Sequence, residues 1–202
     1  MTENEIPNTD DIEFVEEEDS AAEPENFKDF SDAVLYSTDW TVETIINQLE
    51  RNNIQLNPNF QRRDAWSNSR KSKFIESIII GLPIPQLVLA EMKGERGKYI
   101  VLDGKQRLLS LVKFVASKYD KKDGFALSGL EARSDLSRVK YHKLENDPRY
   151  DDDLNAFNNY SIRTVIIRNW PSREFLHQVF LRLNTGSVKL SPQELRQAVA
   201  PG

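Results

Sequence analysis

The most informative stretch of the sequence is YIVLDGKQRLL, residues 99–109. Its first four residues have the apolar character of a strand, and its last residues have the apolar spacing of a helix. The first N–H groups of a helix lack partners within it, so they attract an anion, and Gly104 lets a ligand approach the backbone closely. Lys105 and Arg107 fall in the first turn, where cations oppose the helix dipole and are hard to justify structurally without a phosphate. The stretch therefore predicts a strand–turn–helix unit that holds a phosphate group.

Outward from this unit, short strand patterns mix irregularly with helical ones. Helices are predicted at residues 41–51, 67–80, 104–118, 154–159, 171–183 and 191–199. Strands are predicted at residues 54–56, 86–91, 98–102 and 161–167, with the second and third forming a hairpin. Residues 119–150 are predicted to be mostly loop. Because there is no regular strand–helix–strand repeat, the pattern favours the α+β class.

The net charge of −5 conceals two regions of opposite sign. Residues 1–32 contain thirteen acidic side chains and one basic one, Lys28, and so carry −12; residues 33–202 contain 26 basic and 19 acidic ones and so carry +7. So acidic a segment cannot bury enough apolar surface to fold, which predicts a disordered tail ahead of one domain at 33–202. The asymmetry indicates contact with nucleic acid or another polyanion. The tail either solubilises the chain or competes with that partner for the domain.

Composition and hydropathy narrow the chemistry and the location. Having no cysteine and two histidines excludes thiolate metal sites, iron–sulfur clusters and cysteine nucleophiles. The first thirty residues lack the basic and apolar regions of a signal peptide, and the longest apolar run, residues 78–82, is too short to span a bilayer. A cytoplasmic protein without membrane contact is therefore expected.

The loop at residues 57–66 is a second source of candidate site residues. It follows a predicted strand and precedes a predicted helix, so it can present side chains at one edge of the fold. Arg62 and Arg63 offer planar guanidinium groups that suit phosphate, and Gln61 precedes them. The aromatic residue Trp66 is expected to pack in the core.

Two further features each have two interpretations. Residues 180–186 are typical of a helix C-terminus, which explains Asn184 structurally, but Arg182 and Asn184 could also face a ligand. Asp103 either caps the helix that follows it or helps to hold a divalent ion, Mg²⁺, beside a phosphate. The residues alone leave both alternatives open.

Several motifs occur together, and in order, between residues 36 and 199. They are NPxFQR (57–62), WS (66–67), IxGLPIP (79–85), VLDGKQRLLSL (101–111), SIRTVII (161–167) and FxRLNTGxxxLxxQELR (180–196). In this combination the chain resembles the N-terminal domain of GmrSD-type modification-dependent restriction enzymes. That family is usually marked by a DGQQR motif and is similar to the ParB/sulfiredoxin superfamily.

The resemblance implies a ParB-like α+β fold whose DGxQR turn binds a nucleoside triphosphate and supports its hydrolysis. Matched by position, the nucleotide site comprises residues of this turn and of the QR motif: Asp103, Gly104, Gln106, Arg107, Gln61 and Arg62. Lys105 stands where glutamine is commoner and adds a cation. In this interpretation Arg107 and Lys105 hold phosphates. Gln106 orients water or a phosphate oxygen, and Asp103 holds Mg²⁺.

The family's nuclease activity is attributed to a separate C-terminal module with His-Asn-His chemistry, which nothing in this chain matches. The chain ends just after QELR, where family members normally continue. It is therefore expected to be a fragment, a truncated product or a stand-alone regulatory copy. A nuclease domain or subunit is an expected partner.

Three functions follow from these observations. The leading hypothesis is a nucleoside-triphosphate-binding and hydrolysing domain of a restriction or anti-phage system. The second is a non-enzymatic DNA-binding module that places the same arginines on the DNA backbone, with an affinity that falls steeply with salt. The third is a DNA nuclease or nickase that acts through Asp103 and Lys105.

Overall fold

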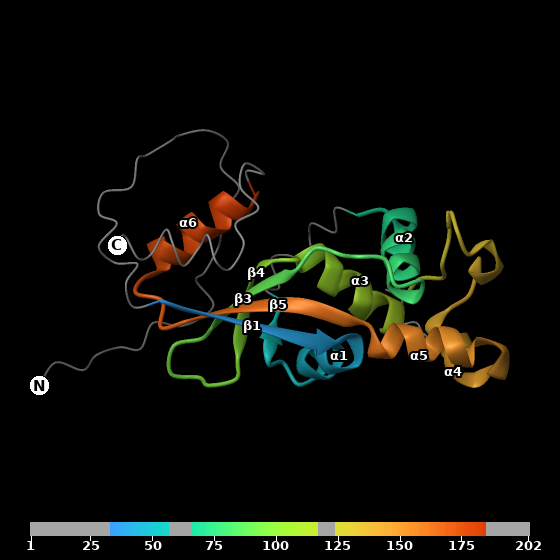
Figure 1. The fold of residues 1–202 in the computed structure, drawn as a ribbon, viewed down its shortest axis with the longest axis horizontal. Coiled ribbons are helices and arrows are strands. Elements are labelled where there is room, and N and C mark those ends of the chain that lie inside the picture. The colour runs from blue at the N-terminus through green and yellow to red at the C-terminus, as the bar shows by residue number, and fades with distance from the viewer. Residues whose placement is uncertain (1–32, 57–65, 117–123, 185–202) are drawn as a thin grey trace, which may run out of the picture.

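The computed structural model describes residues 33–56, 66–116 and 124–184, which form an α+β fold as the sequence predicts (Figure 1). The strands are β1 (Val34–Thr41), β2 (Ile54–Gln55), β3 (Leu87–Glu91), β4 (Tyr99–Asp103) and β5 (Ser161–Arg168). The helices are α1 (Val42–Glu50), α2 (Asn68–Ile79), α3 (Lys105–Ala116), α4 (Tyr141–Asn146), α5 (Asp151–Asn159) and α6 (Arg173–Asn184), with 3-10 turns η5 (Ser134–Leu136) and η6 (Pro148–Tyr150). None of the helices in these ranges has the length and apolar character needed to cross a bilayer. The predicted acidic tail and the predicted helix at 191–199 lie outside the described residues.

The strands form one mixed sheet in the order β1-β5-β3-β4-β2. β3 and β4 pair antiparallel, which confirms the predicted hairpin, and β5 lies parallel to β3. β1 pairs antiparallel with β5 and is a strand that the sequence pattern does not predict. Its apolar residues Val34 and Tyr36 are each 50% exposed, so the strand lacks the buried alternation that would reveal it.

The two faces of the sheet carry separate hydrophobic cores. The larger core joins one face, including Leu89 and Val101, to helices α1 to α5. The smaller core joins the opposite face, including Val88 and Leu102, to α6. Neighbouring residues of a strand point to opposite faces, so one strand serves both cores. Figure 1 shows α6 set apart from the other helices, as this division requires.

Local chemistry sets the limits of α1 and α2. The side chains of Thr41 and Ser67 cap these helices by accepting a hydrogen bond from the N–H three residues further on. α2 is followed by Gly81, whose φ of 75° gives the chain a left-handed turn after the helix. The predicted ends of both helices are confirmed to within one residue.

The prediction of mostly loop for residues 119–150 is wrong in part. Residues 141–146 form α4, the two 3-10 turns lie on either side of it, and Leu127, Leu136 and Leu144 are fully buried. Single apolar residues separated by polar ones attach this segment to the larger core. Neither a helical nor a strand period therefore appears in its sequence.

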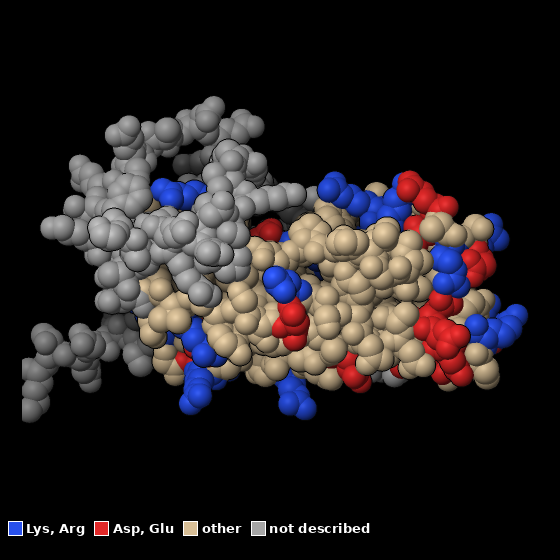
Figure 2. All heavy atoms as spheres, in the orientation of Figure 1, with Lys and Arg blue, Asp and Glu red and all other residues tan. Residues whose placement is uncertain are grey.

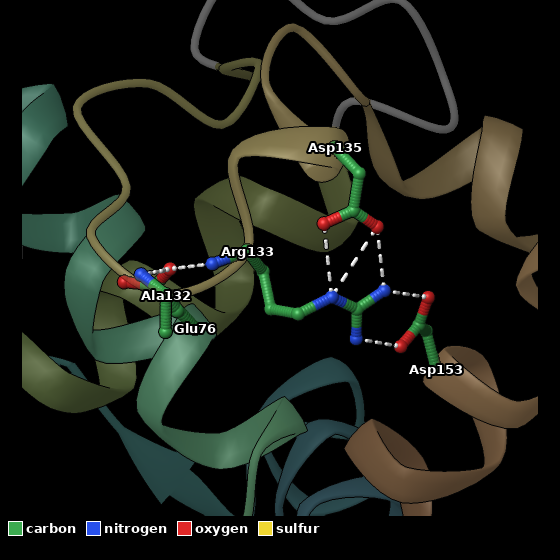
Figure 3. A network of polar contacts seen from close by, with 5 residues as sticks. All are labelled: Glu76, Ala132, Arg133, Asp135 and Asp153. Carbon is green, nitrogen blue, oxygen red and sulfur yellow. Dashed lines mark hydrogen bonds and ion pairs between the residues drawn. The ribbon is translucent and has the colours of Figure 1, made fainter.

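A polar network fastens this segment to α2. The carboxylate of Glu76 accepts hydrogen bonds from the backbone N–H groups of residues 131–133 at 2.7 to 3.1 Å. The guanidinium of Arg133 then bridges Asp135 in η5 and Asp153 in α5 (Figure 3). Burial alone would raise the pKa of Glu76, but these N–H groups outweigh it and hold the pKa below its usual range. One buried carboxylate and one arginine thus connect α2, the segment after α3, and α5.

Candidate functional site

The predicted strand–turn–helix unit is present at the junction of β4 and α3. β4 ends at Asp103, Gly104 forms the turn, and α3 begins at Lys105. The carbonyl of Gly104 accepts the first helical hydrogen bond, from the N–H of Leu108 at 3.0 Å. The first turn of α3 therefore begins directly at the end of an interior strand, which pairs with β3 on one side and β2 on the other.

Gly104 is required by its backbone and by its neighbours. Its φ of 98° lies in a region that residues with a side chain rarely adopt. A Cβ at this position would lie 2.2 Å from Cδ2 of Leu87 and 3.1 Å from Nη2 of Arg107. These two side chains fill the space beside the glycine, which gives it a packing role. The close approach of a ligand at Gly104 stays a prediction.

Arg107 folds back from the first turn of α3 toward the end of β4. Its Nη2 donates a hydrogen bond to Oδ2 of Asp103 at 2.8 Å and another to the carbonyl of Gln86 at 3.0 Å. Because Asp103 balances the charge, the expectation that a first-turn arginine lacks a structural justification is wrong for Arg107. The structure therefore adds a third role to the two predicted for Asp103, that of partner to Arg107.

The ion pair joins one nitrogen of the Arg107 guanidinium to one oxygen of the Asp103 carboxylate. The side chain of Arg107 is 13% exposed and that of Asp103 is 35% exposed. Nε of Arg107 is buried and meets no hydrogen-bond acceptor among the described residues, an arrangement that costs free energy. A guanidinium held at a helix start with an unused N–H is suited to bind an anion, since an oxyanion supplies the missing hydrogen-bond acceptor.

The model of the family described as GmrSD restriction endonuclease, N-terminal domain, matches residues 42–200. The chain belongs to this family. Neither a curated protein nor a solved structure matches it. Membership confirms the resemblance carried by the sequence motifs and assigns the chain to a module of restriction-type defence proteins, whose function is related to DNA.

In this GmrSD N-terminal domain, Asp103 is the candidate residue for binding a metal. Among the described residues, no cluster of three or more histidine, cysteine, aspartate and glutamate side chains could hold an ion alone. Magnesium that arrives with a phosphate chain needs only one or two carboxylates, because phosphate oxygens and water complete its shell. A single, partly exposed carboxylate beside an arginine therefore fits phosphate-bound Mg²⁺ rather than a site built by protein alone.

The remaining candidates lie in two places within the described ranges. Lys105 and Gln106 are partly buried in the first turn of α3, next to Arg107 in the chain. Arg182 is exposed in the last turn of α6, and Asn184 is the final residue of that helix, which confirms the predicted helix end. Residues 61–63 lie outside the described residues, so their contribution to the nucleotide site stays a prediction.

The sequence does not predict the part of this site that comes from Gln86 and from the first residue of β3, Leu87. Gln86 supplies a carbonyl to Arg107, and Leu87 packs where a Cβ of residue 104 would lie. Both residues were predicted only as the start of a strand. The hairpin itself was the usable signal, since antiparallel pairing brings the start of the first strand beside the end of the second.

The described surface of the GmrSD domain carries both signs of charge. Figure 2 shows lysine and arginine side chains interspersed with acidic ones on the face drawn, most closely at the end formed by α4 and α5. Several cations among the described residues are paired with acidic side chains, among them Lys73 with Glu131 and Arg149 with Asp147. On this face the described residues do not form a single continuous basic surface.

Proposed function

We propose that this GmrSD N-terminal domain binds a nucleoside triphosphate at the turn from Asp103 to Arg107 and supports its hydrolysis. The observation that carries the proposal is the buried guanidinium of Arg107, held at the start of α3 with an unused Nε. The sequence DGKQR, which resembles the DGQQR motif, comprises the same residues. The proposal takes residues 33–202 as one ParB-like domain and residues 1–32 as a separate tail.

Positioning and charge stabilisation are the chemistry that such a turn offers. Arg107 and Lys105 would hold phosphate oxygens, and Gln106 would orient the attacking water or a phosphate oxygen. Asp103 would hold Mg²⁺, which supplies positive charge to the phosphates when it is bound. No covalent nucleophile is required of the protein for phosphoryl transfer to water.

The direction of the neighbouring strand supports a role for the QR motif. β2 runs parallel to β4, with Gln55 opposite Ile100, so the carboxyl ends of both strands lie on the same side of the sheet. The described chain leaves β2 at Leu56, five residues before Gln61. We therefore propose that Gln61 and Arg62 contribute to the same nucleotide site as the Asp103–Arg107 turn.

A nucleotide panel with a thermal-shift readout tests the proposal on the full chain. With Mg²⁺ present, at least one nucleoside triphosphate should raise the melting temperature, because a ligand that binds only the folded state stabilises it. Arg107→Ala should abolish that rise. Arg163→Ala is the matched control, since it removes an exposed arginine that is also paired with an aspartate. A panel without any rise, or an Arg107→Ala variant that responds like the unmodified chain, would refute nucleotide binding at this turn.

DNA is the second candidate ligand, and family membership is what favours it. The basic domain would contact phosphates of the backbone, so the logarithm of affinity should fall linearly with the logarithm of salt concentration. Fluorescence anisotropy of a labelled duplex with the full chain measures that slope. Binding that does not change with salt would count against backbone contact, and nicking of a plasmid lost in Asp103→Ala would instead favour the nuclease alternative.

A further inference from the structure

Asp103 and Arg107 form an ion pair in the ligand-free domain. Nη2 of Arg107 lies 2.8 Å from Oδ2 of Asp103, and the pair joins the last residue of β4 to the first turn of α3. The same Nη2 is also bonded to the carbonyl of Gln86. A phosphate that accepts hydrogen bonds from this guanidinium therefore competes directly with the carboxylate of Asp103.

Displacing the carboxylate creates a problem of charge. The phosphate would sit beside Asp103, and two negative charges a few ångströms apart repel strongly where water is partly excluded. Asp103 is the residue that would hold a divalent cation accompanying the phosphate, and the positive charge of that cation would offset this repulsion. Oδ1 of Asp103 has no partner among the described residues, and the side chain is 35% exposed, so this carboxylate can reach such an ion.

The rest of the turn would keep Arg107 in place during the exchange. The Gln86 carbonyl still accepts from Nη2, and Gly104 leaves the guanidinium room to lie against the backbone, 3.1 Å from where a Cβ would stand. Loss of the Asp103 contact alone therefore leaves the arginine positioned. The carboxylate determines what the arginine can bind.

We propose that Asp103 pairs with Arg107 in the ligand-free domain and so makes phosphate binding conditional on a divalent cation. The ligand class is then a metal-complexed diphosphate or triphosphate chain, and bare phosphate groups are rejected. This inference rests on the proposed function, because it concerns the same turn. It adds the reason why the turn would discriminate between free and metal-bound phosphate.

Isothermal titration of the full chain with inorganic pyrophosphate tests the inference without any catalytic readout. The unmodified chain should bind pyrophosphate about tenfold or more tightly with Mg²⁺ than with a chelator. Asp103→Asn should bind it in the presence of the chelator, with a dependence on Mg²⁺ of less than about threefold. Asp39→Asn is the matched control: it removes the same charge from another aspartate–arginine pair, on β1 and β5, and should behave as the unmodified chain.

Two further variants protect the result against a folding defect. Asp103→Ser should reproduce the Asn variant if the latter folds poorly, and Asp103→Glu should retain the requirement for Mg²⁺ because it keeps the charge. If Asp103→Asn shows the same Mg²⁺ dependence as the unmodified chain, or loses pyrophosphate binding altogether, the inference is overturned. If no variant and no condition binds either pyrophosphate or any nucleotide, the proposed function itself fails, which is a different result.

Discussion

Arg107 and Arg133 are both paired with aspartates, and they differ in how many of their N–H groups donate to an acceptor. Arg133 donates from Nε, Nη1 and Nη2 to the carboxylates of Asp135 and Asp153. Among the described residues, Arg107 donates from Nη2 alone, and its buried Nε has no acceptor there. The more buried of the two arginines, Arg107, is thus the less satisfied, with 13% of its side chain exposed against 30% for Arg133.

This difference separates a structural arginine from one suited to bind a ligand. A guanidinium whose donors are all taken gains little from an added anion, and its surroundings hold it for stability. A guanidinium with unused donors carries a cost that a ligand can remove. The ion pairs of Arg133 should therefore contribute more to stability than the Asp103–Arg107 pair, and the Asp103–Arg107 pair should matter more for binding.

Gly104→Ala is expected to have the largest effect on stability, because it introduces both backbone strain and a steric clash. The left-handed backbone strains any side chain, and the new Cβ would meet Leu87 at 2.2 Å, so the variant should lose about 4 kcal/mol of unfolding free energy. Urea denaturation measures the loss. Gly81→Ala is the control: its φ is also positive, but a Cβ there meets nothing within 4 Å, so it should cost only about 1 kcal/mol. Equal losses would show that packing at Gly104 contributes nothing.

Glu76→Gln tests the saturated network. The substitution removes the charge of a carboxylate that is 4% exposed and accepts from three successive N–H groups, so the variant should lose about 3 kcal/mol. Glu131→Gln makes the same change in the same segment, but at an exposed side chain paired only with Lys73, and should cost less than about 1 kcal/mol. Denaturant midpoints of the two variants give the comparison. A Glu76→Gln variant as stable as Glu131→Gln would contradict the anchoring role.

Asp153→Asn and Asp103→Asn compare the two arginines directly. Asp153 is 12% exposed on its side chain and helps to saturate Arg133, so its neutralisation should cost about 2 kcal/mol. Asp103 is 35% exposed, and water screens its pair with Arg107, so its neutralisation should cost about 1 kcal/mol. Thermal and urea unfolding check the order. The reverse order would mean that Asp103 serves stability first.

Much of the fold around the site follows from patterns that lie close together in the sequence. The sequence predicts the Asp-Gly turn, the strand before it and the helix after it, because each signal is local: an apolar run, a glycine and a helical spacing of apolar residues. The hairpin partner of β4 was also predicted. Membership in the GmrSD family was read correctly from several ordered motifs.

The contacts that define the site depend on residues that are distant in sequence. Gln86 lies 21 residues before Arg107, and no pattern in either segment indicates that a carbonyl of one meets a guanidinium of the other. The pairing of Asp103 with Arg107 is a spacing of four, which a helix would suggest. Asp103 ends a strand, however, so the spacing rule for helices does not predict this pair.

The dependence of the unfolding free energy on acidic pH tests whether the charge of Glu76 contributes to the network around Arg133. The N–H groups of residues 131–133 hold the pKa of Glu76 below its ordinary value of 4.5, despite burial, which acts in the opposite direction. A lowered pKa in the folded state means that the stabilisation is fully present above about pH 4.5 and is lost as the pH falls through the folded value. The unfolding free energy of the unmodified chain should therefore fall more steeply below pH 4.5 than that of Glu76→Gln, and the two curves should converge. Parallel curves would show that the network stabilises the domain through packing, without the charge of Glu76.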